Sequence, residues 1–160
     1  MSGYCIERIK KEIIYFEHLQ QGISAYHWIT LSGDWDSYVQ FFQEVLKINS
    51  PNKNYVDFYY HTLSQEEKDR FISSLSMQEI HILERYQEEK EIFYDLKNQD
   101  IEFFLSISYK EILFSTFYFT KFPCTIWTNY NQRFLLFCRD TNDLKMYMNL
   151  ANNYKLVIEQ

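Results

Sequence analysis

Glycine and proline are scarce in this chain of 160 residues, which contains 3 glycines and 2 prolines. This scarcity excludes collagen-like, glycine-loop-rich and proline-linker architectures, and it predicts elements joined by short polar turns. A glycine-rich phosphate loop cannot be built either, because the three glycines are far apart in the sequence: Gly3, Gly22 and Gly33. The chain therefore has no nucleotide-binding fingerprint.

Metal-binding and redox patterns are also missing. The three cysteines are odd in number and form no CxxC pair, and the four histidines form no HxH or HExxH motif. We expect no metal site and no cofactor, and we expect the thiols to be reduced. Inert core cysteines are the favoured reading of Cys124 and Cys138, and a cysteine nucleophile beside a histidine is the alternative.

Long hydrophobic runs are absent as well. The most apolar stretch, residues 112–119, contains Ser115 and Thr116 and is far shorter than the ~20 residues of a membrane helix. The N-terminal segment mixes charged with apolar residues and shows no secretory signal. These features predict a cytoplasmic protein without a membrane partner.

What the chain does contain is apolar and charged material for one globular domain over residues 1–160, with 46% apolar and 24% charged side chains. Apolar residues at helical spacing predict a first helix over residues 4–20, with Gly22 as its stop. Residues 23–31 are compatible with a strand or a buried loop. Asp34 is expected to cap a second helix that ends at residues 49–52.

Two capping boxes mark the middle of the chain. Ser64 with Glu67 predicts a short helix over residues 65–75, and Ser76 with Glu79 predicts a long one over residues 77–97. The preceding aromatic run, residues 55–61, is of uncertain type. A third S-x-x-E pattern, Ser108 with Glu111, predicts another helix start. The residues that follow it, 112–119, have a composition that favours a strand, so the two signals conflict.

The last third of the chain predicts a small sheet. Residues 124–129 and 133–138 flank a turn and indicate two antiparallel strands, which with residues 112–119 would form a meander. Thr141 is expected to cap a helix through Asn153, and residues 155–159 to form a terminal strand. The predicted fold class is α+β, with N-terminal and central amphipathic helices packed on a small, mostly antiparallel C-terminal sheet.

The negative charge is concentrated in one segment. The formal net charge is −6, and residues 64–102 hold eleven acidic and five basic side chains, an excess of six. On a helix over residues 77–97, four of these carboxylates would form one stripe: Glu84, Glu88, Glu91 and Asp95. Such a stripe favours a basic protein partner. The alternative is a solvated face that keeps an aromatic-rich protein in solution.

Aromatic residues are abundant, with 14 Phe, 14 Tyr and 3 Trp. Most should lie in the core, but a pocket between the helices and the C-terminal sheet is expected to be lined by His61, Trp127 and Tyr130. Direct nucleic-acid binding is not expected, because residues 103–160 hold only six basic against four acidic side chains.

The main functional hypothesis is a non-catalytic acidic binding domain. In its concrete form the protein is an inhibitor or immunity-type protein that covers the basic active site of a toxin or nuclease. The alternative is a small-molecule-binding or enzymatic domain with the aromatic pocket. A third possibility is a self-associating structural subunit.

Overall fold

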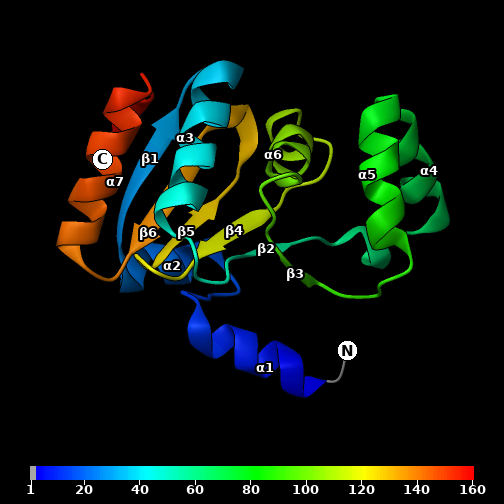
Figure 1. Cartoon of the computed structure of the whole chain (residues 1–160), viewed down its shortest axis with the longest axis horizontal. Coiled ribbons are helices and arrows are strands. Elements are labelled where there is room, and N and C mark those ends of the chain that lie inside the picture. Colours follow the sequence, from blue (N-terminus) through cyan, green and yellow to red (C-terminus); the bar gives the residue numbers. More distant parts are fainter. Residues whose placement is uncertain (1–2) are drawn as a thin grey trace.

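A computed structural model describes residues 3–160, and side chains from residue 6 onward. The strands form one seven-stranded sheet in the order β3-β2-β4-β5-β6-β1-β7, with every neighbouring pair antiparallel. The sheet lies beside a group of helices (Figure 1), so the α+β class is confirmed. The strands are β1 His27–Ser32, β2 Tyr55–Asp57, β3 Phe93–Asp95, β4 Thr116–Phe119, β5 Cys124–Trp127, β6 Phe134–Cys138 and β7 Val157–Glu159.

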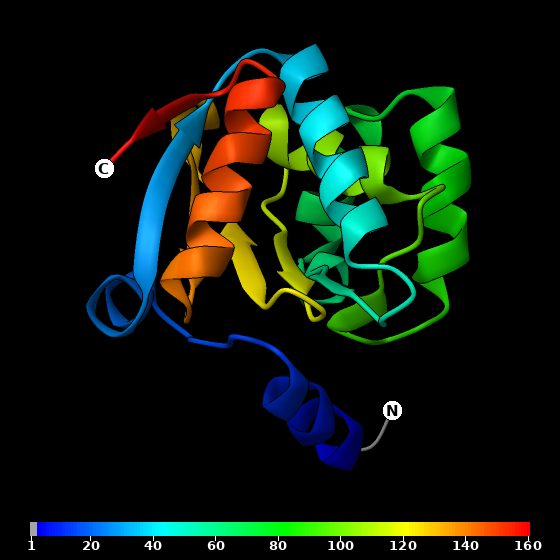
Figure 2. The ribbon, with the colours of Figure 1, turned by 60° about the vertical axis from the view of Figure 1, so that its left-hand side comes forward.

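The helices occupy both sides of this sheet. Helices α3 and α7 stand side by side over one face, and α1 lies apart from them below the sheet (Figure 2). Two short 3₁₀ turns, η1 Tyr60–Thr62 and η2 Tyr130–Gln132, complete the elements. The helices are α1 Gly3–Glu12, α2 Leu19–Ala25, α3 Trp35–Ile48, α4 Gln65–Ser73, α5 Met77–Gln87, α6 Ile101–Tyr109 and α7 Thr141–Asn153.

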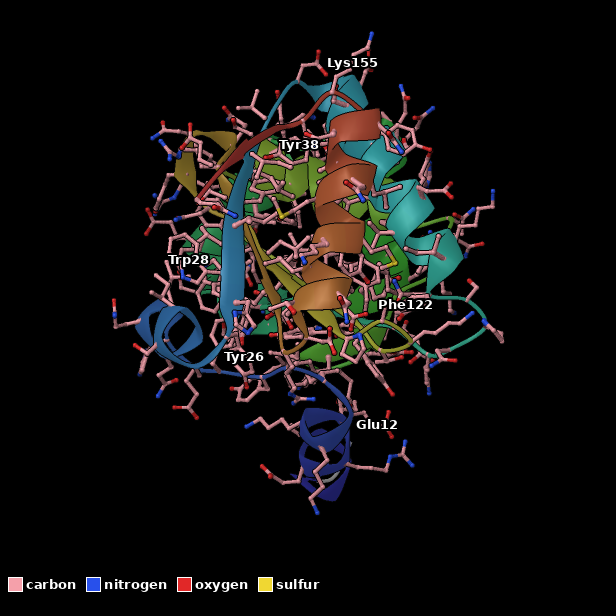
Figure 3. All side chains as sticks on the ribbon, turned by 90° about the vertical axis from the view of Figure 1, so that its left-hand side faces the viewer. Glu12, Tyr26, Trp28, Tyr38, Phe122 and Lys155 are labelled. Carbon is pink, nitrogen blue, oxygen red and sulfur yellow. The ribbon has the colours of Figure 1, made fainter. Side chains whose placement is uncertain are left out.

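The two faces of the sheet have separate cores because strand side chains alternate. The larger core lies under α3, α6 and α7 and continues to Phe71 of α4 and Tyr86 of α5. On the other face, smaller clusters form around Tyr118 and around Phe137. Figure 3 shows Tyr38 and Trp28 on opposite sides of β1, in line with their separate clusters.

The predicted first helix over residues 4–20 is wrong in its length. Helix α1 ends at Glu12, and residues 13–18, here called the strap, lead to the separate helix α2. Ile13 and Ile14 are both buried, but in different clusters. An extended chain can place successive side chains in two clusters, whereas a helix cannot. Gly22 does not stop a helix, because it lies inside α2.

The predicted long helix over residues 77–97 is also wrong. Helix α5 ends at Gln87, and β3 then pairs with β2 at the edge of the sheet. Phe93 and Tyr94 are 5% exposed each and enter the cores on the two faces of the sheet. Burial of both aromatic rings outweighs the helical pattern of the surrounding charges, since large rings contribute far more than single i,i+4 pairs.

Of the three predicted capping boxes, the first is confirmed in full. The Ser64 hydroxyl accepts from the Glu67 N–H at 3.2 Å, and the Glu67 carboxylate accepts from the Ser64 N–H at 2.7 Å. At the next helix the Ser76 hydroxyl accepts from the Glu79 N–H at 3.2 Å. The Glu79 carboxylate instead accepts hydrogen bonds from the Ser106 hydroxyl of α6 and from Lys110, which follows α6. This second box is therefore half formed.

Helix α6 has no counterpart among the predictions. Ser108 lies inside it and does not begin a helix, so the third capping box is wrong and the strand reading of this region is confirmed, starting at Thr116. The meander β4-β5-β6 is confirmed, as is the Asp34 cap, which accepts from the Ser37 N–H at 2.8 Å. Asp140, one residue before Thr141, caps α7.

Candidate functional site

A cavity of about 390 Å³ lies between the strap and the face of the sheet opposite α3 and α7. The strap is held on this face by the Thr125 hydroxyl, which donates to the Ile14 carbonyl oxygen at 2.6 Å. We call this space the strap cavity. Its lining residues come from the strap, from β2, β4 and β5, and from the segments that follow or precede these strands: Tyr15, Phe16, Glu17, Asp57, Tyr59, Phe114, Thr116, Tyr118, Trp127, Thr128 and Asn129.

Strand alternation explains why these side chains meet. In β2, Val56 enters the helix-side core, which leaves Asp57 on the strap side. In β4, Phe117 and Phe119 enter the helix-side core, and Tyr118 lies on the strap side. The same period in β5 brings Trp127 to the strap side.

Asp57 is the most unusual group in the strap cavity. The residue is 4% exposed, and its carboxylate accepts from the Thr116 N–H at 2.6 Å and from the Tyr118 hydroxyl at 3.2 Å. Burial raises the pKa of Asp57 to about 7, and hydrogen bonds from Thr116 and Tyr118 oppose this rise. A buried carboxyl group with a strongly raised pKa beside a cavity marks a candidate functional site.

Aromatic rings form the walls. The rings of Phe16 and Trp127 stack with centroids 5.4 Å apart and an interplanar angle of 13°. Burial raises the pKa of Tyr59 to about 12 and holds the pKa of Tyr118 well above its ordinary value. Both phenol groups therefore stay protonated at neutral pH and can act as hydrogen-bond donors.

The three predicted pocket residues are not all brought together. Trp127 lines the strap cavity, and the ring of the exposed Tyr130 packs edge-on against Phe114 with centroids 4.8 Å apart. His61 lies elsewhere, with its Nε2 3.0 Å from the Tyr86 carbonyl oxygen. Sequence reasoning missed Asp57, although it is the only acidic residue in the aromatic run of residues 55–61.

The four carboxylates of the predicted stripe lie on different parts of the backbone. Glu84 Oε2 is 3.5 Å from His81 Nδ1, and Asp95 Oδ1 is 3.2 Å from Lys53 Nζ. Helix geometry therefore does not align these groups, because α5 ends at Gln87, before the second of them. Their positions are Glu84 on α5, Glu88 at the C-terminal end of α5, Glu91 in the following loop and Asp95 on β3.

A second cavity, of about 320 Å³, includes two of these carboxylates but has mixed charge. Four basic side chains line it beside four acidic ones: Arg8, Lys53, Arg85 and Lys97 with Glu89, Glu91, Asp95 and Asp100. Asp100 is as buried as Asp57, but its carboxylate accepts from Arg85 and from the Tyr86 hydroxyl. This cavity therefore offers a ligand no net charge.

A wider groove of about 840 Å³ lies beside the C-terminal half of α3. Its polar lining is mostly amide and includes Gln43, Asn52, Asn54 and Asn98. Most of the lining is exposed, and it contains no buried acid with a raised pKa. The strap cavity therefore has the more specific chemistry.

In the described part of the chain, no group of three or more His, Cys, Asp or Glu side chains is arranged to hold a metal ion. Among residues 3–160 no helix is both long and apolar enough to cross a membrane. Neither the comparison with protein-family models nor the searches of curated proteins and of solved structures found a match to this chain.

Proposed function

We propose that this protein is a binding domain that holds a small molecule in the strap cavity. The observation that carries the proposal is the buried Asp57 carboxyl group on the wall of an aromatic cavity of about 390 Å³. Ligand pockets in proteins typically measure ~300–1,000 Å³ and combine apolar walls with a few convergent polar groups.

The chemistry of the lining favours binding over catalysis. Within the described residues, the lining contains no histidine, cysteine, lysine or arginine, so neither a cysteine or lysine nucleophile nor a histidine base is present there. The raised pKa values of Tyr59 and Tyr118 suit hydrogen-bond donors better than bases. The proposed place of action is the cytoplasm, where the free thiols of Cys124 and Cys138 would stay reduced.

The test is a ligand screen of the full chain by thermal shift and by NMR, with Tyr59→Ala as the site variant. Tyr59 is 37% exposed and lines the cavity, so its removal should weaken binding without unfolding the protein. Met77→Ala, at a position that is 71% exposed on α5, is the control and should bind ligands normally. Ligands that bind both variants as tightly as the parent chain would count against the strap cavity.

A second proposal follows from the charge of the α4–α5 region, which stands at one end of the molecule (Figure 1). Residues 64–91 hold eight acidic against four basic side chains, and Glu84 and Glu88 are exposed. An excess of negative charge of this kind raises the association rate with a basic partner. In this proposal the protein is an inhibitor or immunity-type protein that covers the basic active site of a toxin or nuclease.

Charge reversal distinguishes this second proposal from the first. The variant Glu84→Lys, Glu88→Lys, Glu91→Lys should lose a basic partner that the parent chain retains at low salt. A control with the same change of charge places lysine at Glu7, Asp36 and Glu102 and should keep that partner. Equal retention by both variants would overturn the docking proposal and leave the strap cavity untouched.

A further inference from the structure

We infer that the ligand of the strap cavity is a small organic cation, with a protonated or quaternary ammonium group held between aromatic rings and the Asp57 carboxylate. This inference rests on the proposed small-molecule function and names the class of ligand. It is carried by the geometry and charge of the lining, taken in three steps below.

The first step is the charge of the lining. Its ionisable side chains are two carboxylates, Asp57 inside and Glu17 at the exposed rim, together with tyrosines, and it contains no basic group. The ion pairs found among residues 6–160 do not include Asp57, whose hydrogen-bond donors are both neutral. A ligand cation would therefore supply the missing opposite charge.

The second step is a comparison within the same fold. Asp57 and Asp100 are 4% and 1% exposed, and each carboxylate accepts a hydrogen bond from a tyrosine hydroxyl. Asp100 also has a guanidinium partner in Arg85, as a buried carboxylate usually requires. Asp57 has no such partner and lines the cavity, so a bound ammonium group can supply the charge that Arg85 supplies at Asp100.

The third step is the aromatic wall. Six aromatic side chains line the cavity: Tyr15, Phe16, Tyr59, Phe114, Tyr118 and Trp127. Ring faces attract cations, and tryptophan does so most strongly. The lining contains only two carboxylates, and no three metal-ligating side chains are grouped among the described residues, whereas Ca²⁺ takes six to eight oxygen ligands and Mg²⁺ takes six. A soft organic cation fits this surface better than an inorganic one.

Protonation of Asp57 makes the inference testable by pH. The ionisable groups that line the cavity with Asp57 are Tyr118 of β4, Tyr59 after β2, and Tyr15 and Glu17 of the strap. Outside the lining, Lys10 Nζ of α1 lies 4.5 Å from the centroid of the Tyr15 ring. With a pKa near 7, Asp57 is mostly neutral at pH 6 and mostly ionised at pH 8. A permanent cation should therefore bind about tenfold more tightly at pH 8 than at pH 6.

The experiment compares matched probes on the full chain. Choline, tetramethylammonium and benzyltrimethylammonium are the cationic probes, and 3,3-dimethylbutan-1-ol has the shape of choline without its charge. Binding is followed by NMR titration and calorimetry at pH 6 and pH 8. We expect a cationic probe to bind at least tenfold more tightly than the neutral alcohol at pH 8.

Variants locate the effect. Asp57→Asn should remove both the preference for the cation and its pH dependence, while circular dichroism shows an intact fold. Asp36→Asn, which changes an exposed acid on α3, should keep both. If Asp57→Asn unfolds, Trp127→Leu serves as a second variant. It should weaken binding of the cation more than binding of the neutral alcohol.

The possible results distinguish a cation site from a site for neutral molecules. Equal affinity for choline and its neutral analogue overturns the inference but leaves a small-molecule site. Failure of every cationic probe at millimolar concentration also overturns it, and the proposed function then stands only if neutral compounds shift the resonances of cavity residues. The absence of any such compound in the screen would overturn both.

Discussion

At the scale of single residues, Asp57 shows how one buried group links stability to function. Its carboxyl group is 4% exposed, and its two donors do not compensate for the loss of water. Buried ionisable groups whose charged form is destabilised by the loss of water are common at functional sites. The cost is measurable in the absence of any ligand.

The substitution Asp57→Asn should flatten the pH dependence of stability. The folded pKa, about 7, lies above the ordinary value of 3.8, so between these values the folded chain binds more protons than the unfolded chain. The wild-type free energy of unfolding should therefore fall as pH rises, by about 2.5 kcal/mol from pH 5 to pH 8 through this group. Urea denaturation of both proteins at the two pH values measures this difference. Parallel pH profiles would show that Asp57 titrates normally.

At the scale of elements, the strap is the segment on which the site depends. Its side chains enter two clusters, and one buried hydrogen bond connects its backbone to the middle of the sheet. The neighbouring α2 holds the ring of Phe16 from the other side, because an added Cβ at Gly22 would lie 2.6 Å from Phe16 Cζ.

The substitution Thr125→Val should lower the free energy of unfolding by about 1–3 kcal/mol, because it leaves the buried Ile14 carbonyl without its donor. Hydrogen exchange should also become faster in the strap. Thr120→Val provides a matched control, since the Thr120 hydroxyl donates to the Lys53 carbonyl at an exposed site where water can replace it. A similar decrease in the free energy of unfolding in both variants would mean that the hydrogen bond to the strap contributes no more to stability than the exposed one.

The substitution Gly22→Ala should also be destabilising. In an open helix this change would stabilise by about 1 kcal/mol, but here the new methyl group must displace Phe16, whose ring packs against Trp127 and Phe137. We expect the free energy of unfolding to decrease by about 1 kcal/mol or more, as measured by thermal and chemical denaturation. Ser24→Ala, at an exposed position of the same helix, is the control and should be neutral or stabilising. A more stable Gly22 variant would contradict the tight packing.

At the scale of the whole molecule, one large core joins the α4–α5 region to the sheet. Phe71 of α4 and Tyr86 of α5 belong to the same cluster as Phe117 of β4. Phe58, which follows β2, lies between them, with its ring centroid 6.2 Å from those of Phe71 and Tyr86. A single domain over residues 1–160 stays a prediction, and this shared cluster offers a way to test it.

The substitution Phe71→Ala tests that prediction. Phe71 is 4% exposed, and its truncation should cost about 3 kcal/mol. If the chain unfolds as one unit, tryptophan fluorescence and far-ultraviolet circular dichroism should shift together to lower urea concentrations. Met77→Ala, exposed on α5, should leave both transitions in place. Separate transitions in the Phe71 variant would show that the α4–α5 region unfolds independently.

The sequence by itself determined the features whose signals are local. The caps at Asp34 and Ser64, the meander of β4, β5 and β6 and the α+β class all depend on residues a few positions apart. The aromatic character of the site was also visible, since Trp127 was identified as a pocket residue.

Only the tertiary structure decided the strap, β3 and the site at Asp57. Each depends on partners distant in sequence: Ile14 on Thr125, Tyr94 on Val56, and Asp57 on Thr116. Helical spacing over residues 4–20 and 77–97 was a real local preference. Burial of Ile14, Phe93 and Tyr94 in cores that the rest of the chain creates was the stronger term, and it ended both helices early.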